Sequence, residues 1–449
     1  MNRSRTWRAV AVILALSLAA AGCGRDDDDS GDSDDSSTDD TSASSASFID
    51  PAEDCEDYQP TQGISGDTIT VGTVRPAQGP YAIYDTVTKG VEKFFDAANA
   101  KGGVKAGDGK SYKIKLLKED DGYDPGRTPD AVKKLVEQDQ VFAMVGQIGT
   151  ENNLSVRTYI NDKCVPSVAL ATGSPEWGKA AEYPWFIGGL PSYAAEARVA
   201  LEFLEKDNPD ATIALLYQND DFGKSYQAAI EKYIEDTGSQ MSVVAQQPYD
   251  PNSGQTTEGV TTQLAQSGAD VFFVGIGGTP CPRTLTFIPA DWQPTVYVSI
   301  TCSGKIALSL AGGKDEGIYS TQAQLDAASP ADQANPKVQQ FIQDGQAQGL
   351  TMTDIEGGIV SAGWGFASIF ARALELSPTV ERADIMNTLY SMQDENFGLM
   401  RDEMSVNTND AEDPWLFEQL RMVHREGGQW VQASELVEFD GESNEFVGG

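Results

Sequence analysis

The sequence predicts an α/β fold with two doubly wound parallel-sheet lobes, joined by a multi-crossover hinge. Strand-like and helix-like patterns alternate along the chain, and this alternation is typical of βαβ units that build parallel sheets. The alternation occurs in two separate series. Residues 64–449 are also more than one hydrophobic core usually spans, so each series is assigned to its own lobe.

The first series predicts an N-terminal lobe, to which residues 64–190 and 321–392 are assigned. Its first helix follows from Val87, Val91 and Phe95, which recur at helical spacing. The strand-like runs are 68–74, 112–117, 142–145 and 165–170, and the remaining helical runs are 131–136 and 152–160.

The second series predicts a C-terminal lobe, to which residues 191–320 and 393–449 are assigned. Gly427 and Gly428 interrupt a late β-rich segment, so a hairpin is expected there. The strand-like runs are 211–217, 241–245, 271–274, 296–299, 417–424 and 429–431, and the helical runs are 225–233 and 261–266.

Helices are expected to dominate residues 336–390. The helix over 355–376 carries Gly357, Gly358, Gly363 and Gly365, which favour close packing against a neighbour. Because these late elements return to the two lobes, the chain crosses between the lobes several times. Several crossings at one edge form a hinge.

The N-terminus has the pattern of an export signal. Arg3, Arg5 and Arg8 precede an apolar run over residues 9–21, which is shorter than a membrane span. Residues 1–22 are therefore interpreted as a signal peptide. The small residues before Cys23 resemble a bacterial lipobox, which predicts lipidation of Cys23 at the extracytoplasmic face of the cell membrane. The alternative is an ordinary cleaved signal beside a stray cysteine.

Residues 23–63 are rich in Asp, Ser and Thr, with Asp26 to Asp29 in one block. Such a segment has too little apolar surface to offset the entropy of ordering, so a disordered acidic tether is expected. The whole chain has 68 acidic and 32 basic residues and a net charge of -36. This charge disfavours nucleic acid and anionic lipid headgroups as partners, leaving the lipid anchor as the expected membrane contact.

Four cysteines remain beyond Cys23, an even number in an exported protein, which indicates disulfides. Cys281 and Cys302 follow two consecutive predicted strands, so these two are expected to pair. Cys55 would then join the end of the tail to Cys164. A zinc site is the rival interpretation, but the sequence has no CxxC motif and a single histidine.

Two nucleotide-binding motifs are incomplete. Residues 222–225 resemble the end of a P-loop, but Gln218 stands where the loop needs a glycine. Gly275, Gly277 and Gly278 follow a predicted strand, but Pro280 stands where a dinucleotide fingerprint needs its third glycine. No cofactor is therefore expected.

The sequence also gives little support for any known set of catalytic residues. His424, the single histidine, lies in a predicted strand, which disfavours a Ser-His-Asp or Cys-His centre. Acidic pairs such as Asp120-Asp121 and Asp220-Asp221 leave an acid–base hydrolase as an alternative. The prediction is a protein that is not an enzyme and holds no metal.

A binding cleft is the remaining expectation, because ligands of doubly wound sheets lie beyond the carboxyl ends of the strands. Residues 146–152 lead from a strand into a helix at such an end. Thr150 and the free amides at that helix start favour an anion such as a carboxylate. The structural alternative is that Thr150 only caps the helix.

Weak motifs occur in a fixed order along the body. They are Thr68-Ile69-Thr70-Val71-Gly72, Gly79-Pro80 with Tyr84, Asp120 to Pro125, Gly146 to Asn152, Val168 to Gly173, Tyr217 to Lys224 and the helix around Trp364. Together they resemble the leucine/isoleucine/valine-binding family of ABC-transporter substrate-binding lipoproteins, over roughly residues 68–431. The resemblance implies a type I periplasmic binding protein, with two α/β lobes and three crossovers that close on a solute.

The resemblance also implies where the ligand lies. The family's carboxylate loops and cleft aromatics fall on Ile148, Gly149, Thr150, Ala171, Thr172, Gly173, Tyr84 and Phe222. Two positions depart from the family. Gly277 replaces a tyrosine of the second lobe, and Thr301 replaces the glutamate that pairs with the ligand's ammonium group. Asp220 or Asp221 could substitute for that glutamate, so an amino acid and an amine-free carboxylate both stay open.

The sequence therefore predicts a monomeric, lipid-anchored solute receptor that delivers a small organic acid or amino acid to the permease and ATPase subunits of an ABC importer. The alternative is an extracellular sensor lobe that reports the ligand to a signalling partner. The lipid anchor favours transport, because a sensor usually carries its own membrane span.

Overall fold

The computed structural model describes residues 47–447, and the predictions for the signal peptide and for Cys23 lie outside this range. The first of two sheets has the strand order β3-β4-β2-β5-β6-β7, with β1 beside β2. β2, β4, β5, β6 and β7 run parallel, and β1 and β3 pair antiparallel. The strands are β1 (Ile64–Ser65), β2 (Thr68–Arg75), β3 (Val104–Lys105), β4 (Ser111–Asp120), β5 (Ala143–Val145), β6 (Ser167–Leu170) and β7 (Phe186–Gly188).

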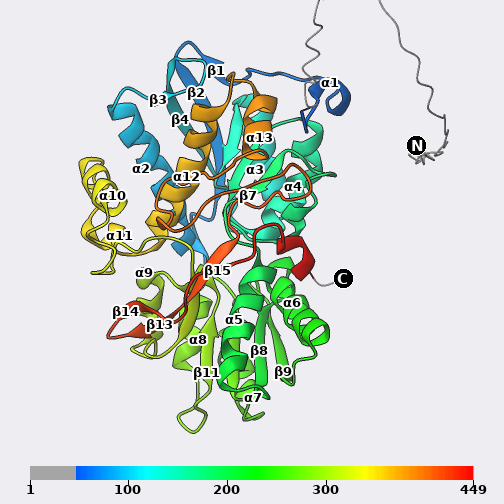
Figure 1. The fold of residues 1–449 in the computed structure, drawn as a ribbon, viewed down its shortest axis with the longest axis vertical. Coiled ribbons are helices and arrows are strands. Elements are labelled where there is room, and N and C mark those ends of the chain that lie inside the picture. The colour runs from blue at the N-terminus through cyan, green and yellow to red at the C-terminus, as the bar shows by residue number, and fades with distance from the viewer. Residues whose placement is uncertain (1–46, 448–449) are drawn as a thin grey trace, which may run out of the picture. The chain divides into compact units, whose positions relative to one another are not determined.

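Helices cover both faces of this sheet (Figure 1). α2 and α12 share one core cluster with Val71 and Val145, whereas α3 and α4 share another with Val74 and Met144. Val71 and Val74 of β2 therefore point to opposite faces of the sheet, and so do Met144 and Val145 of β5, as the pleat requires. The helices of this lobe are α1 (Pro51–Asp54), α2 (Asp85–Ala100), α3 (Thr128–Lys133), α4 (Thr150–Asp162), α10 (Pro336–Ala347), α11 (Met352–Ile355), α12 (Ile359–Leu376) and α13 (Arg382–Leu389).

α12 is the central helix of the first lobe. In the described chain it alone is long and apolar enough to cross a membrane, but 78% of that window is buried, as in the core helix of a globular body. A Cβ on Gly363 would lie 1.9 Å from the carbonyl oxygen of Val87, and one on Gly90 would lie 2.1 Å from that of Val360. The predicted close packing is therefore confirmed at Gly363, but the predicted helix over 355–376 is interrupted: α11 ends at Ile355 and α12 begins at Ile359, so Gly357 and Gly358 precede α12.

The second sheet has the order β14-β13-β12-β11-β10-β8-β9, with β15 beside β13. β8 to β12 run parallel, and β13 and β14 form the predicted hairpin. Its strands are β8 (Thr212–Gln218), β9 (Ser242–Tyr249), β10 (Val271–Gly275), β11 (Thr295–Val298), β12 (Tyr319–Gln322), β13 (Gln419–Glu426), β14 (Gln429–Gln432) and β15 (Val437–Glu438).

This sheet is also covered on both faces, which confirms the predicted fold class. Leu201 and Ile230 pack with Leu215 on one face, and Leu264 and Leu285 lie in the cluster on the other. The helices of this lobe are α5 (Tyr193–Asp207), α6 (Asp221–Thr237), α7 (Glu258–Ala265), α8 (Pro280–Thr286) and α9 (Lys305–Leu308).

The chain passes between the two sheets three times. The crossings lie between β7 and α5, between β12 and α10, and between α13 and β13. All three pass through the waist between the lobes in Figure 1. The multiple crossovers implied by the family resemblance are present.

The strands that sequence periodicity missed are β1, β3, β7, β12 and β15. Strands of two to four residues are too short for an alternating pattern to stand out. The helix expected over 131–136 is divided, because α3 gives way to a π-helical turn, η2 (Lys134–Gln138). The remaining short helical turns are η1 (Ala82–Tyr84), η3 (Pro175–Gly178), η4 (Ile300–Cys302), η5 (Ser309–Ala311) and η6 (Ser443–Phe446).

The tether prediction over residues 23–63 is wrong for its last part, residues 47–63, which pack against the first lobe. Ile49 is fully buried, and the ring of Phe48 meets that of Tyr390 edge to face at 5.0 Å. The Tyr58 hydroxyl accepts a 2.8 Å hydrogen bond from the amide of Ala383. Burial of these apolar side chains offsets the entropy that the segment loses when it becomes ordered.

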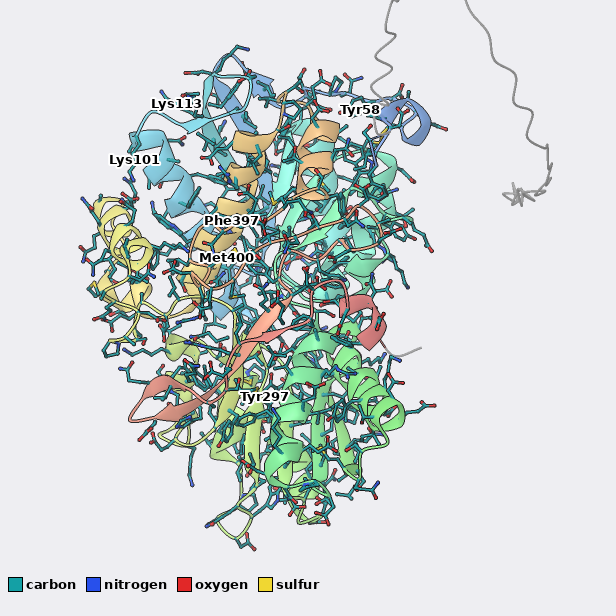
Figure 2. The ribbon with its side chains drawn as sticks, in the orientation of Figure 1. Tyr58, Lys101, Lys113, Tyr297, Phe397 and Met400 are labelled. Carbon is teal, nitrogen blue, oxygen red and sulfur yellow. A yellow bond between two sulfur atoms is a disulfide. The ribbon has the colours of Figure 1, made fainter. Side chains whose placement is uncertain are left out.

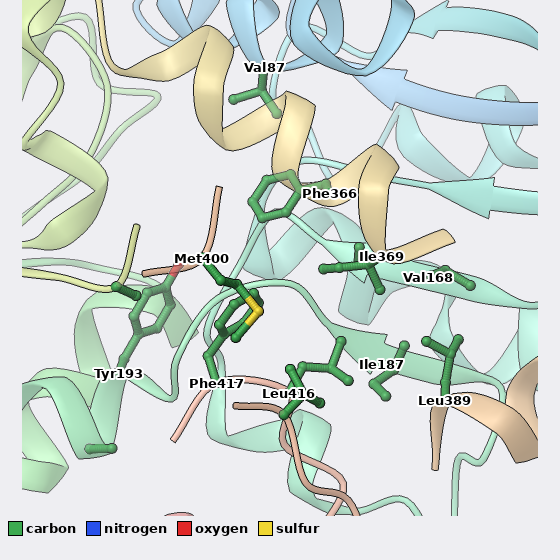
Figure 3. Packing of buried hydrophobic residues seen from close by; sticks show 14 of the residues in the cluster. Val87, Val168, Ile187, Tyr193, Phe366, Ile369, Leu389, Met400, Leu416 and Phe417 are labelled. Atoms are coloured by element: carbon green, nitrogen blue, oxygen red, sulfur yellow. The ribbon is translucent and has the colours of Figure 1, made fainter. Parts of the chain in front are cut away.

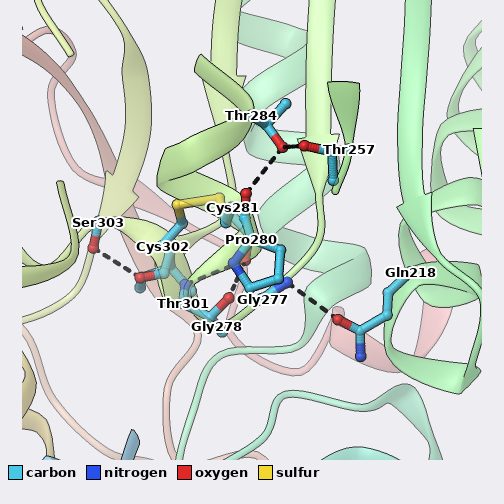
Figure 4. Close-up of a disulfide and its surroundings, with 12 residues drawn as sticks. Gln218, Thr257, Gly277, Gly278, Pro280, Cys281, Thr284, Thr301, Cys302 and Ser303 are labelled. Atoms are coloured by element: carbon cyan, nitrogen blue, oxygen red, sulfur yellow. Dashed lines mark hydrogen bonds between the residues drawn. A yellow bond between two sulfur atoms is a disulfide. The ribbon is translucent and has the colours of Figure 1, made fainter. Parts of the chain in front are cut away.

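Both predicted disulfides are present. Cys55 joins Cys164, with Cα atoms 6.1 Å apart, and Cys281 joins Cys302, with Cα atoms 6.2 Å apart. Figure 4 shows the second bond beside Gly277 and Gly278, and it ties α8, which follows β10, to the helical turn η4 (Ile300–Cys302), which follows β11.

Candidate functional site

A cavity of about 170 Å³ lies between the carboxyl ends of the two sheets. Both lobes and all three crossings contribute to its wall. The lining residues predicted from the sequence are Tyr84, Ile148, Gly149, Thr150, Ala171, Phe222, Gly277 and Thr301. Parallel sheets place the loops after their strands at one edge, which brings these distant segments together.

The first wall is the start of α4. Gly149 precedes the helix with φ +99°, a conformation that favours glycine, and it is the N-cap residue. Thr150 is the first residue of the helix, so the alternative that Thr150 caps α4 is wrong. Its hydroxyl instead lies 2.6 Å from that of Thr172. The first-turn amides of a helix have no acceptor within the helix, so α4 presents donors at the cavity wall.

Thr172 and Gly173, also predicted as ligand residues, stand behind this wall and do not line the cavity. Thr172 is fully buried, and its side chain supports Thr150. A Cβ on Gly173 would lie 2.0 Å from the carbonyl oxygen of Pro191. These two positions therefore hold the wall and the first crossing against each other.

Tyr84 reaches from the first lobe to the second. Its hydroxyl accepts a 2.7 Å hydrogen bond from the amide of Gly278 and donates to the carbonyl of Thr301 at 3.2 Å. A Cβ on Gly277 would lie 3.0 Å from that hydroxyl. The second-lobe position that lacks the family's tyrosine thus borders a tyrosine from the first lobe.

Further contacts join the lobes beside the cavity. The Tyr81 hydroxyl donates to Gln218 at 2.7 Å, and Glu151 accepts from the amide of Asp221 at 2.9 Å. The amide of Thr279 donates to the carbonyl of Pro80 at 3.0 Å. The lobes are therefore in a closed arrangement.

Asp220 and Asp221, considered as substitutes for the missing glutamate, do not line the cavity. Asp220 caps α6 by accepting from the amide of Gly223 at 3.2 Å and also accepts from the Gln218 side chain. Burial raises the pKa of Asp220 to about 6. The structure brings neither carboxylate to the predicted ligand.

A buried carboxylate lies under the loop that carries Thr301. Glu196 on α5 accepts hydrogen bonds from the hydroxyls of Tyr226 (2.7 Å) and Tyr297 (2.6 Å) and from the amide of Ile300 (2.8 Å). Figure 2 labels Tyr297 in the interior of the second lobe. Burial raises the pKa of Glu196 to about 7, although the three donors oppose this.

Sequence reasoning missed the aromatic and polar lining that the crossings and α12 supply. Figure 3 shows Tyr193, Phe366 and Phe417 converging from three segments. No strand pattern marks the crossings, so the sequence offered a signal only at Tyr123, which lies inside a quoted motif. The lining residues that the sequence analysis missed include Tyr123, Tyr193, Lys305, Gln324, Asp326, Phe366, Phe417 and Trp430.

Two α/β lobes that close on a mostly apolar cavity define the class of two-lobed solute-binding proteins. A family model described as periplasmic binding protein matches residues 68–429. The chain belongs to this family of periplasmic binding proteins.

Curated relatives match over part of their length. A leucine-, isoleucine-, valine-, threonine- and alanine-binding protein of Pseudomonas aeruginosa is 25% identical over 181 residues, 40% of this chain and 47% of the relative. The Leu/Ile/Val-binding protein homolog 7 of Brucella abortus is 24% identical over 214 residues, 45% of this chain and 51% of the relative. The chain thus spans about half the length of the curated relatives it matches.

Solved structures match over nearly their whole length. A branched-chain amino acid ABC transporter protein from Thermus thermophilus with bound valine has a TM-score of 0.72 at 16% identity, covering 84% of this chain and 98% of that one. A solute-binding protein from R. palustris in complex with 4-hydroxybenzoate has a TM-score of 0.68 at 18% identity, covering 83% and 98%. At these identities the likeness is one of fold.

Proposed function

We propose that this protein is a lipid-anchored, monomeric receptor on the outer face of the cell membrane that delivers a small carboxylate to an ABC importer. Family membership supports solute binding for transport. The lipobox-like residues before Cys23 support the anchor. The two sheets support a lobe of residues 64–190 and 321–392 that moves against one of residues 191–320 and 393–449, except that Thr321 and Gln322 belong to β12 of the second sheet.

The observation that carries the ligand class is the wall at Gly149 and Thr150. Free first-turn amides and the helix dipole favour a negative group there, and the surrounding lining is mostly apolar. An organic carboxylate satisfies both conditions. Neighbours of the same fold carry valine and 4-hydroxybenzoate, which are both carboxylates.

The ligand does not need an α-amino group in this proposal. Thr301 stands where the resemblance places an ammonium-binding glutamate, and its hydroxyl lies 3.0 Å from that of Ser299. A hydroxyl neutralises no ammonium charge. Amine-free carboxylates therefore bind at least as well as their α-amino counterparts.

Calorimetry on Thr150→Val tests the carboxylate wall. Removing the hydroxyl breaks the hydrogen bond to Thr172, which still accepts from the amide of Ser174, and disturbs the amides at the start of α4. We therefore expect carboxylate binding to weaken by about 1–3 kcal/mol, with a much smaller change in stability. Thr262→Val is the matched control, because this threonine is exposed and bonds only within α7. A large loss of melting temperature with unchanged affinity would make Thr150 a structural residue.

The ligand arm of the same experiment compares each keto acid with the amino acid of the same side chain. Equal or tighter binding of the keto acids supports recognition without an ammonium site. A consistent preference for the amino acids would contradict it.

A further inference from the structure

The cavity carries a carboxylate that the proposed function does not use. Among the described residues that line it, only Lys305 and Asp326 bear a full charge. Lys305 is paired, with its Nζ 2.9 Å from a carboxylate oxygen of Glu356. Asp326 has no ion pair within 4 Å in the described chain.

Local hydrogen bonding engages only one of the two carboxylate oxygens of Asp326. It lies in the crossing after β12, where its Oδ1 accepts from the amide of Ala328 at 2.8 Å. This contact engages one oxygen and closes a short turn. The second oxygen has no hydrogen-bond partner among the residues described, and the residue as a whole is half-buried.

The cations near Asp326 are already engaged. Arg425 pairs with Asp315 at 3.2 Å, and the guanidinium of Arg421 donates to side-chain oxygens of Gln322 and Gln432. Asp332, the neighbouring acid, pairs with Arg401 at 3.0 Å. Burial raises the pKa of Asp326 even though Arg425 and Lys305 oppose it, so the surrounding cations do not compensate its charge.

Asp326 and Thr150 have different neighbourhoods. Thr150 contacts Thr172 at the start of α4, whereas the charged groups that act on Asp326 include Lys305 at the start of α9. α4 and α9 lie well apart on the two sides of the waist in Figure 1. Gln324 and Trp430 line the cavity with Asp326. Gln324 offers an amide oxygen to a cationic group, and the ring of Trp430 already lies 5.3 Å from the guanidinium of Arg425.

We propose that Asp326 is a cation-binding position of this cleft, so that the ligand carries a carboxylate at one end and an ammonium or guanidinium group at the far end of an apolar chain. The inference rests on the proposed function, because the same cavity must take the carboxylate. It agrees with Thr301, because the amine it requires is distal and not on the α-carbon. A half-buried carboxylate without a counter-ion favours a ligand that neutralises it.

Calorimetry with paired probes tests the position. The probes are pentanoate and hexanoate, each against its ω-amino form, and 4-guanidinobutanoate. With the wild-type chain we expect the cationic forms to bind at least tenfold more tightly than the unsubstituted acids. Asp326→Asn keeps the acceptor for Ala328 and should remove that advantage while changing the affinity for unsubstituted acids by less than about twofold.

The matched control is Asp250→Asn. Asp250 is exposed and its Oδ1 accepts from the amide of Asn252 at 2.9 Å, in the same kind of turn but away from the cavity. It should leave every affinity unchanged. Melting curves of both variants show that each one is folded.

Two results would overturn the inference. If unsubstituted acids bind as well as their ω-amino forms and remain sensitive to Thr150→Val, the carboxylate receptor stands and the cation position is refuted. If the amine advantage persists in Asp326→Asn, the cation binds elsewhere. Failure of every carboxylate, with or without an amine, refutes the proposed function as well.

Discussion

Glu196 makes the stability of this protein depend on pH. The side chain projects from α5, is fully buried beside the helical turn η4, and has three donors around it. Glu196→Gln removes the titrating group with little change of shape. The amide oxygen can accept from Tyr297 and Ile300, and the new NH₂ can donate to Tyr226, whose hydroxyl lies 2.7 Å from Ser299 and can donate there instead.

The magnitude follows from the raised pKa. Glu196 has an ordinary pKa of 4.5, and burial raises it to about 7 in the folded protein. At about 1.4 kcal/mol per pH unit, this difference corresponds to roughly 3 kcal/mol. Below pH 4.5 the carboxyl is protonated in both states, and its contribution is fully present. The contribution is lost as the pH rises from 4.5 through 7, because the unfolded chain ionises first.

Chemical denaturation of the wild-type chain and of Glu196→Gln at intervals from pH 4 to 8.5 measures this contribution. We expect the difference in unfolding free energy between the two proteins to change by about 3 kcal/mol in favour of the variant between pH 4.5 and 8. Asp220 and other groups titrate in both proteins and cancel in the difference. Parallel curves over this range would refute the raised pKa of Glu196.

Two further predictions concern packing and anchoring. Gly363→Ala places a methyl group 1.9 Å from the carbonyl oxygen of Val87 and should destabilise the fold by about 1–3 kcal/mol in a denaturation experiment, whereas Gly259→Ala, in a helix position with open space, should be neutral or slightly stabilising. We expect the N-terminal peptide to be diacylated at Cys23. Mass spectrometry of this peptide from the membrane fraction detects the modification. A released protein with an unmodified Cys23 would contradict the lipid anchor.

The sequence predicted the sheets well because their central strands are buried and continuous in hydrophobicity. β8 and β10 are examples. The segments that follow such strands include Thr150 at the start of α4, Phe222 at the start of α6 and Gly277, which line the cavity. The strand endings therefore located one part of the site without any knowledge of tertiary contacts.

The crossings escaped prediction for a physical reason. Asp326 and Phe417 belong to irregular segments whose position depends on the packing of both lobes, and no periodicity marks them. The same limit applies to Phe48 and Ile49. The segment around them was predicted to be disordered from its acidic composition. Phe48 and Ile49 pack only against the folded first lobe, which the composition does not reveal.

The segment over residues 47–63 determines which lobe resists a mechanical force applied to the chain on its N-terminal side. Its attachments are all to the first lobe: the Cys55–Cys164 disulfide, the hydrogen bond between Ile49 and Asn387 at 2.8 Å, and the bond from the Arg382 amide to the carbonyl of Pro60 at 3.0 Å. Tension along the chain is therefore transferred covalently to the first lobe before it reaches any crossing. If the lobes move as the proposed function requires, the second lobe swings open and shut while the first is held, and the load does not pass through the hinge.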